Sequence, residues 1–356
     1  MISSRQAYIL ITLFIAITCF FSCAQKSTMT SSEQVTLNAL IIDGENNHGI
    51  WPMTTMMLKD YLEETGKFTV AIKRKKYTWQ GPHSDGDPTI GKERREQLIA
   101  EFPLNGGVST SPVEEPKADP DFNPDFMKYD LVVTNLGWKA SDWPEATKNN
   151  FEDFIQNGGG LVVIHAANNS WGDWEAYNKM IGVGGWGGRG EDYGNYAYYD
   201  KNEKDQRDPS TGPCGSHGAQ QEYLITHRDQ NHPITKGLPL KWLHTQDELY
   251  DRLRGPAENM TILGTAYSDK EKNGPPWAKD VKGSGRHEPM LSAIEFGKGR
   301  VFHNAMGHSD YSMECVGFMT MFQRGAEWAA TGKVTQTIPS DFPTAIKSSS
   351  RKWNDN

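Results

Sequence analysis

Cysteine is scarce in this sequence, with four residues among 356. No CxxC pair occurs, so the paired-cysteine ligand set of most structural zinc sites is missing. Cys19 and Cys23 lie in the N-terminal segment, which leaves Cys214 and Cys315 for the rest of the chain. These two could pair in an oxidising compartment, but one pair so far apart in the chain forms no disulfide framework.

A membrane-spanning run of ~20 apolar residues is also missing from the N-terminal segment. The apolar run 7–21 follows Arg5 and has the length of a signal-peptide core. Ser22, Cys23 and a polar stretch come next, which resembles a bacterial lipoprotein signal with Cys23 as the lipidated residue. The alternative is an ordinary secretory signal that is cut nearby. We expect a signal peptide (1–22), a flexible tether (23–36) and a bacterial cell-envelope protein that meets the membrane through its lipid anchor only.

An excess of basic residues is lacking as well. The formal net charge is −8, and the one basic run, 73–76, is short. Nucleic-acid binding needs clustered Lys and Arg to neutralise phosphates, so nucleic acid is excluded as a partner. The sequence also contains no internal repeat.

The segments that are present alternate between strand and helix patterns. Short apolar runs predict buried parallel strands at 37–43, 68–74, 129–136 and 160–166. Between them, helical spacing runs from Met53 to Tyr61, and a second helix is expected over 144–155. This order predicts an α/β fold with right-handed βαβ units: a flavodoxin-like, doubly wound, mainly parallel sheet with helices on both faces.

Secondary structure is harder to predict for two long insertions and for the second half of the chain. Residues 75–127 are rich in Pro, Gly and charged residues and are expected as a long insertion with one helix at KERREQLIAEF. Residues 182–218 contain few aliphatic residues and are expected as an extended loop. Further strands are predicted at 222–226, 259–268, 290–297 and 300–307, the last two as a hairpin, with a final helix over 315–331. The domain should span 37–335 and be followed by a C-terminal tail (336–356).

Histidines stand where the predicted strands end. In open α/β sheets the ligand lies beyond the carboxyl ends of the strands, which directs attention to His48, His165 and His308. Glu248 adds a carboxylate close in sequence to His244. We predict His165, His48, Glu248 and His308 as catalytic residues, and as the ligands if a divalent metal such as zinc binds. Two alternatives are a buried His165 that bonds a backbone carbonyl and a His48 that caps the next helix.

Polar and aromatic residues near these histidines suggest how a substrate would bind. Aromatic faces stack on sugar rings and amides bond sugar hydroxyls. The predicted substrate-binding residues are Asn168, Asn169, Trp171, Trp174, His217 and Asp247. In the alternative interpretation, the aromatic residues merely give a glycine-rich loop its own small core.

Several motifs occur in one order: LIIDGENNHGIW, GGGLVVIHAA, DQNHPITKGLP, HTQDELYDRL and GRVFHNAMGHSDYS. Together they resemble the ThuA-like (trehalose utilisation) family over residues 37–331. The resemblance implies a flavodoxin-like fold related to class I glutamine amidotransferases, which carry a nucleophilic cysteine at the turn after the strand that ends at His165. This chain has no cysteine there, which excludes thioester chemistry.

Two functions follow from the resemblance. The first is an enzyme of carbohydrate catabolism that acts on a sugar or keto-glycoside by hydrolysis or isomerisation, through metal-assisted or metal-free acid–base chemistry. Sugar oxidoreductases of the same pathway would be its partners. The second is a non-catalytic sugar-binding lipoprotein that holds ligand for another enzyme. Such a binder does not need several histidines and a carboxylate at strand ends.

Overall fold

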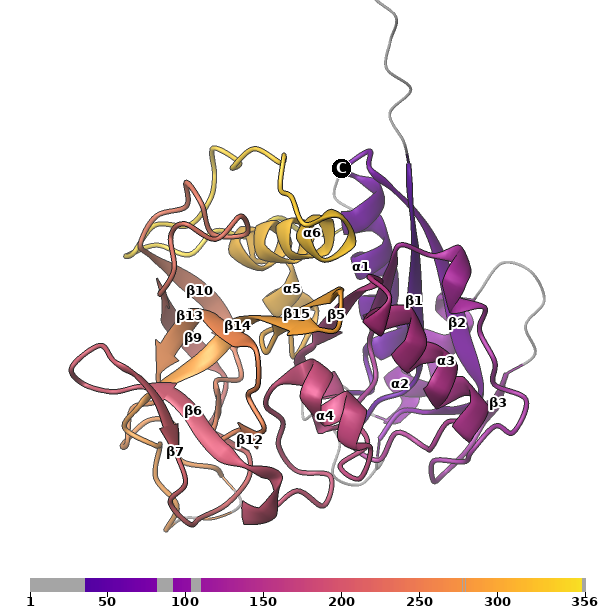
Figure 1. Ribbon diagram of the computed structural model, residues 1–356, viewed down its shortest axis with the longest axis horizontal. Coiled ribbons are helices and arrows are strands. Elements are labelled where there is room, and N and C mark those ends of the chain that lie inside the picture. The colour runs from indigo at the N-terminus through magenta and orange to yellow at the C-terminus, as the bar shows by residue number, and fades with distance from the viewer. Residues whose placement is uncertain (1–35, 82–91, 104–109, 277, 279, 354–356) are drawn as a thin grey trace, which may run out of the picture. The chain divides into compact units, whose positions relative to one another are not determined.

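One large sheet of thirteen strands organises the computed structural model (Figure 1). The structure describes residues 36–81, 92–103, 110–276, 278 and 280–353. The predicted signal peptide, Cys23 and almost all of the tether lie outside the described residues. Among the described residues, no helix combines the length and the apolar character needed to cross a bilayer.

Six of the ten strands on the main path form a parallel block, in agreement with the predicted mainly parallel sheet. In spatial order this block contains β3 (Ser111–Pro112), β2 (Phe68–Trp79), β1 (Leu37–Glu45), β4 (Leu131–Thr134), β5 (Gly160–Ile164) and β15 (Gly299–Asn304). All five pairings between these neighbours are parallel. The central strands are continuously buried, as strands covered on both faces should be.

The other four strands of the main path are antiparallel. Beyond β15 lie β14 (His287–Phe296), β13 (Met260–Tyr267), β9 (Gln221–His227) and β10 (Lys241–Asp247). Strands β14 and β15 form the predicted hairpin. Four successive antiparallel pairings separate β15 from β10, so β10 runs in the same direction as β15. The carboxyl ends of β1, β5, β15 and β10 therefore lie at one edge of the sheet.

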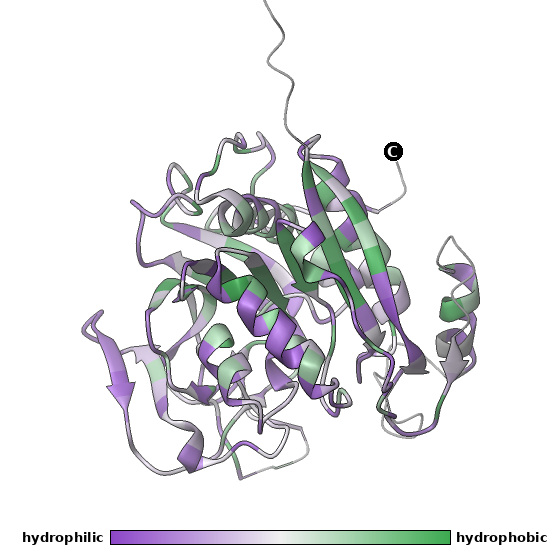
Figure 2. Cartoon of the chain, turned by 45° about the vertical axis from the view of Figure 1, so that its right-hand side comes forward, coloured by the Kyte–Doolittle hydropathy of each residue, from purple (hydrophilic) through white to green (hydrophobic). Residues whose placement is uncertain are grey.

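Helices cover both faces of the sheet, which confirms the predicted architecture. Successive residues of β1 point to opposite sides of the sheet. Ile41 packs with α1 (Trp51–Glu63) and α6 (Val316–Thr331), while Ile42 packs with α3 (Glu145–Gln156) and α4 (Glu175–Ile181). The two cores are thus separated by the sheet. Figure 2 shows the apolar colouring concentrated on the central strands.

The structure contains elements that the sequence pattern did not indicate. Helix α4 and strand β10 were not predicted, and the expected loop 182–218 contains β6, β7 and β8 (Asn195–Tyr199, Asp205–Asp208 and Ser216–His217). Helix α2 (Lys92–Glu101) is the one expected within the insertion 75–127. The remaining short elements are β11 (Tyr250–Asp251), β12 (Arg254–Gly255), α5 (Asp310–Met313), and the 3-10 turns η1 (Phe126–Lys128), η2 (His165–Asn169) and η3 (Glu191–Tyr193).

The predicted C-terminal tail packs on the domain. The indole nitrogen of Trp353 donates a hydrogen bond of 3.0 Å to Asp60 on α1. Phe342 and Ile338 pack against the core on the α6 side of the sheet. Up to Trp353, the described part of this segment therefore belongs to the same body as the sheet.

Candidate metal centre

Four side chains converge at the edge where the parallel strands end. His48 follows β1, His165 follows β5, His308 follows β15 and Glu248 follows β10. One potential ligand atom from each lies within 4.8 Å of the other three. Among the residues that the structure describes, no other group of three or more His, Cys, Asp or Glu meets this criterion. The four residues predicted as catalytic are thus brought together.

His165 occupies a strained corner. Its backbone φ is +43°, in the left-handed region, directly after β5. Its Nδ1 lies 2.8 Å from the carbonyl oxygen of Ala305, so Nδ1–H donates and Nε2 carries the lone pair. The ring stacks on Tyr250 at 4.3 Å. The imidazole therefore bonds a backbone carbonyl, as one alternative held, and also presents its second nitrogen to the cluster.

His48 is oriented in the same manner. Its Nδ1 lies 3.1 Å from Oδ1 of Asn46, which also accepts a hydrogen bond from the His48 backbone N–H. The ring centroid is 4.9 Å from that of His165 and 4.5 Å from that of His308. The amide oxygen can only accept, so this contact selects the tautomer in which Nε2 is the potential ligand.

Glu248 lies at the centre of the histidines. Its Oε1 is 3.1 Å from Nδ1 of His308 and 3.5 Å from Nδ1 of His217. Burial alone would raise the pKa of Glu248, but His308 and His217 hold this pKa well below its usual range. The side chain is therefore a buried carboxylate anion.

Two buried polar atoms face each other without hydrogen bonds. Nε2 of His165 and Oε2 of Glu248 lie 3.5 Å apart, and neither has a hydrogen-bond partner among the described residues. Beside His165 is a small cavity of about 10 Å³, also lined by Asn46, His48 and His308. That volume is on the scale of one water molecule or ion. A cation would satisfy both atoms.

The donor set fits a transition-metal ion. Three imidazoles and one carboxylate suit zinc, iron or nickel better than calcium or magnesium, which favour oxygen ligands. Ligand atoms on one tetrahedral zinc ion lie ~3.4 Å apart for bonds of 2.0–2.1 Å. The 4.8 Å spread is wider, so the side chains must draw inward to bind such an ion.

Asp247, which was predicted to bind substrate, lies behind this cluster. It is completely buried, and its carboxylate lies 2.9 Å from Nε2 of His244. Burial would raise the pKa of Asp247, but His244 lowers it to about 2. For His244 burial has the opposite effect and would lower the pKa, but Cys315 and Asp247 raise this pKa to about 9. The structure therefore gives Asp247 an ion pair in the interior instead of a contact with substrate.

The predicted substrate residues after β5 are buried too. Trp171 and Trp174 pack edge to face at 5.4 Å within the core on the α3 side. Asn168 is fully buried and lies 3.0 Å from Nε2 of His303, while Asn169 is 4% exposed. The two tryptophans belong to the main core on this side of the sheet, so the structure uses them for packing instead of presenting them to a substrate.

The aromatic residues beside the cluster come from other segments. The ring of Trp186 lies 4.8 Å from that of Tyr250 and 5.9 Å from that of His217. Trp186 is partly exposed and has a left-handed φ of +51°. Tyr250 was missed from the sequence, although it stands two positions after Glu248. His217 was predicted, and it lies beside Glu248.

The cysteines do not extend the site. Cys214 and Cys315 are both free and buried. Cys214 and His217 have a CxxH spacing, but the Cys214 thiol donates to the Gly184 carbonyl while His217 faces Glu248. The two side chains therefore have different partners.

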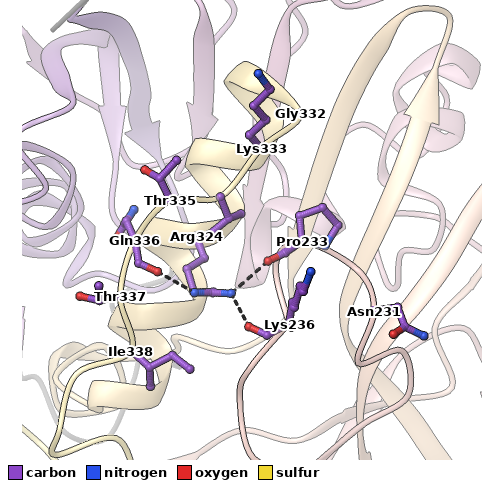
Figure 3. Close-up of a pocket in the computed structure, with 11 residues that line it drawn as sticks. Asn231, Pro233, Lys236, Arg324, Gly332, Lys333, Thr335, Gln336, Thr337 and Ile338 are labelled. Carbon is purple, nitrogen blue, oxygen red and sulfur yellow. Dashed lines mark hydrogen bonds between the residues drawn. The ribbon is translucent and has the colours of Figure 1, made fainter. Parts of the chain in front are cut away.

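A larger hollow of about 670 Å³ lies away from the cluster, beside the end of α6. Figure 3 shows Arg324 at its base, bonded to the carbonyl oxygens of Pro233, Lys236 and Gln336. A fourth bond goes to the carbonyl oxygen of Ile234. The guanidinium is thus used to fasten two chain segments to α6, so this hollow is a structural junction.

Comparisons with known proteins agree with the resemblance seen in the sequence. The family model described as ThuA, trehalose utilisation, matches residues 92–329. A ThuA-like crystal structure from Parabacteroides merdae is 39% identical, with a TM-score of 0.72, and covers 90% of this chain and 100% of its own. A second, from Bacteroides uniformis, is 17% identical with a TM-score of 0.51, covering 89% and 98%. No curated protein matches.

Proposed function

Because the chain belongs to the ThuA family, whose description is trehalose utilisation, we propose that it is a metal-dependent enzyme of carbohydrate catabolism. Its substrate would be a sugar or keto-glycoside, and the reaction a hydrolysis or an isomerisation. The observation that carries the proposal is the convergence of His48, His165, Glu248 and His308 within 4.8 Å. A protein that only binds sugar has no need of such a buried set of ligands.

The metal would be held by the three imidazoles and Glu248. When bound, a divalent ion polarises a carbonyl oxygen or lowers the pKa of a coordinated water. Two of these ligands are oriented by second hydrogen bonds, from His165 to Ala305 and from His48 to Asn46. Such contacts fix both the tautomer and the direction of an imidazole ligand.

His217 is the proposed proton acceptor. Its Nδ1 lies 2.8 Å from the carbonyl oxygen of Gly218, which assigns the proton to Nδ1 and makes Nε2 the basic nitrogen. Burial lowers the pKa of His217, so the imidazole is neutral near pH 7 and able to take a proton. The ring approaches Glu248 through Nδ1, so as proton acceptor it would have to face a substrate group bound to the ion with its Nε2.

Trp186 would supply a stacking face for the sugar. It is partly exposed next to His217 and Tyr250, and the backbone around it is close-packed. A Cβ on Gly215 would lie 2.8 Å from the Trp186 ring, so glycine is needed there to seat the indole. A rigid aromatic surface beside polar groups is typical of carbohydrate sites.

Elemental analysis of the purified protein, combined with a rate assay on a keto-glycoside, tests the proposal. We expect about one divalent metal per chain and turnover that EDTA abolishes and zinc restores. The matched control is Trp174→Phe, a change in the aromatic core away from the ligands, which should keep its metal and most of its activity. Sugar binding without metal or turnover would instead establish the sugar-binding lipoprotein.

A further inference from the structure

Asp247 accepts hydrogen bonds from three backbone amides at the proposed centre. Its Oδ1 accepts from the backbone N–H of Glu248 at 2.8 Å and from that of His308 at 3.0 Å. Its Oδ2 accepts from the backbone N–H of Gly307 at 2.7 Å and contacts Nε2 of His244 at 2.9 Å. One carboxylate therefore ties β10 to the loop that follows β15.

The loop from Ala305 to His308 in turn touches three of the four ligands. It supplies His308, its Ala305 carbonyl accepts the Nδ1–H of His165, and its amides share Asp247 with the amide of Glu248. The loop lacks regular secondary structure. Asp247 thus fixes the segment on which the spacing of the ligands depends.

Gly307 shows that this loop has little freedom. Its φ is +105°, a backbone conformation that residues with a side chain rarely adopt, and a Cβ would lie 2.7 Å from the Phe318 ring. The amide of Gly307 can therefore point at Asp247 only because position 307 lacks a side chain.

The local shape of β10 sets the direction of the carboxylates. His244 pairs with Tyr223 and Asp247 with Gln221, so β10 holds one more residue than β9 over this stretch. Such a bulge re-aims the side chains that follow it and is common beside functional sites. It leaves His244 and Asp247 in contact inside the protein and Glu248 directed at the histidines.

On the basis of the proposed metal centre, we propose that Asp247 is the positioning residue of that centre and that His244 holds Asp247 in place. Asp247 does not itself contact the ion. It fixes the amides of Glu248 and His308 so that their side chains reach one point, and through the same loop it sets the carbonyl that orients His165. Loss of this support should weaken metal binding while the fold remains.

Asp247→Asn tests this role directly. The side-chain amide of Asn keeps the shape of the Asp side chain, but its NH₂ group must face N–H groups whose hydrogen bonds the carboxylate accepted. We expect Co²⁺ to bind ~10–100-fold more weakly in calorimetry after EDTA treatment, the usual range for lost outer-sphere support of a metal ligand. The visible absorption of bound Co²⁺ should change as well, which a merely structural role would not cause.

Glu327→Gln is the matched control. Glu327 is also a buried carboxylate that accepts backbone N–H bonds, from Thr335 at 3.0 Å and Gln336 at 3.3 Å, but it lies on α6. This variant should lose stability while its Co²⁺ affinity stays within about twofold of wild type, because it leaves the ligand loop unchanged.

The outcomes separate the two proposals. A wild-type protein that binds neither Co²⁺ nor Zn²⁺ overturns the metal centre and this role with it. A wild type that binds Co²⁺ and an Asp247→Asn variant with the same affinity and spectrum overturn the positioning role alone. If Asp247→Asn does not fold, His244→Gln decides: weaker Co²⁺ binding supports the role, and unchanged binding overturns it.

Discussion

Nε2 of His165 lies 3.5 Å from Oε2 of Glu248, and both atoms are buried without hydrogen-bond partners among the described residues. Leaving a buried polar atom unpaired costs about 1–3 kcal/mol. Both atoms carry this free-energy cost, and an ion bound between them would remove it for each. Other buried atoms also lack partners, but this pair differs because it lies within the group of four potential metal ligands.

We expect His165→Ala to abolish zinc binding and turnover. In EDTA the variant should lose little stability, because the substitution removes one unpartnered nitrogen along with the hydrogen bond to Ala305. Calorimetry with Zn²⁺ and a melting curve in EDTA on the same protein check this. A large drop in melting temperature with zinc affinity intact would show that His165 serves the core alone.

Zinc should stabilise the wild-type protein against heat. A ligand at about 100 times its Kd adds ~2.7 kcal/mol to the free energy of unfolding, or ~4 °C in Tm for a domain of this size. Glu248→Gln should abolish the shift, because it replaces the charged ligand by a neutral amide. Equal zinc shifts in both proteins would place the metal elsewhere.

The apolar strands made half of this site predictable. The run from Leu161 to Ile164 is continuously apolar, so the end of a buried strand at His165 could be inferred from the sequence. The same holds for His48, after the run that ends at Ile42. At parallel strand ends, sequence position and spatial position are linked by the topology of the sheet.

The other half depends on contacts that no local pattern records. Strand β10 alternates buried and exposed residues and includes polar His244 and Asp247, so it lacks the apolar run that revealed β5. Glu248 joins the cluster only because four antiparallel pairings return β10 to the direction of β15. Trp171 and Trp174 were predicted to bind sugar because aromatic rings stack on sugar rings, but tertiary packing places both side chains in the core.

Arg324 should be a stability residue without influence on the metal centre. Its guanidinium is bonded to carbonyls of both the 233–236 turn and the segment after α6 (Figure 3). We expect Arg324→Ala to lower the free energy of unfolding by about 3 kcal/mol, since several buried carbonyls lose a charged donor. Denaturant unfolding measures the loss. Zinc affinity should be unchanged, and a reduced affinity would contradict this separation.

Cys23 tests the localisation that the sequence predicts. We expect Cys23→Ala to move the protein from the membrane fraction to the soluble fraction, because removal of the acylated residue removes the lipid anchor. Fractionation of cells that express each form, followed by immunoblotting, provides the measurement. Recovery of both forms from the membrane in equal amounts would argue for a retained helical anchor instead.

Glu288 should make stability depend on pH in a direction opposite to that of most carboxylates. Burial, together with the nearby charge of Asp251, raises the pKa of Glu288 to about 7, and Oε1 of Glu288 has no hydrogen-bond partner among the described residues. Asp251 accepts hydrogen bonds from Ser268 and Ser284. With its raised pKa, Glu288 keeps its proton up to about pH 7.

A carboxyl group whose pKa is higher in the folded state stabilises the fold at low pH, and this contribution is lost as the pH rises through the folded value. Wild type should thus lose stability between about pH 5 and pH 8 relative to Glu288→Gln, whose neutral side chain does not titrate. At pH 8 the variant should be the more stable protein, by ~1–3 kcal/mol. Melting curves of both proteins across this range measure the difference. Parallel curves would mean that Glu288 is already charged at pH 5.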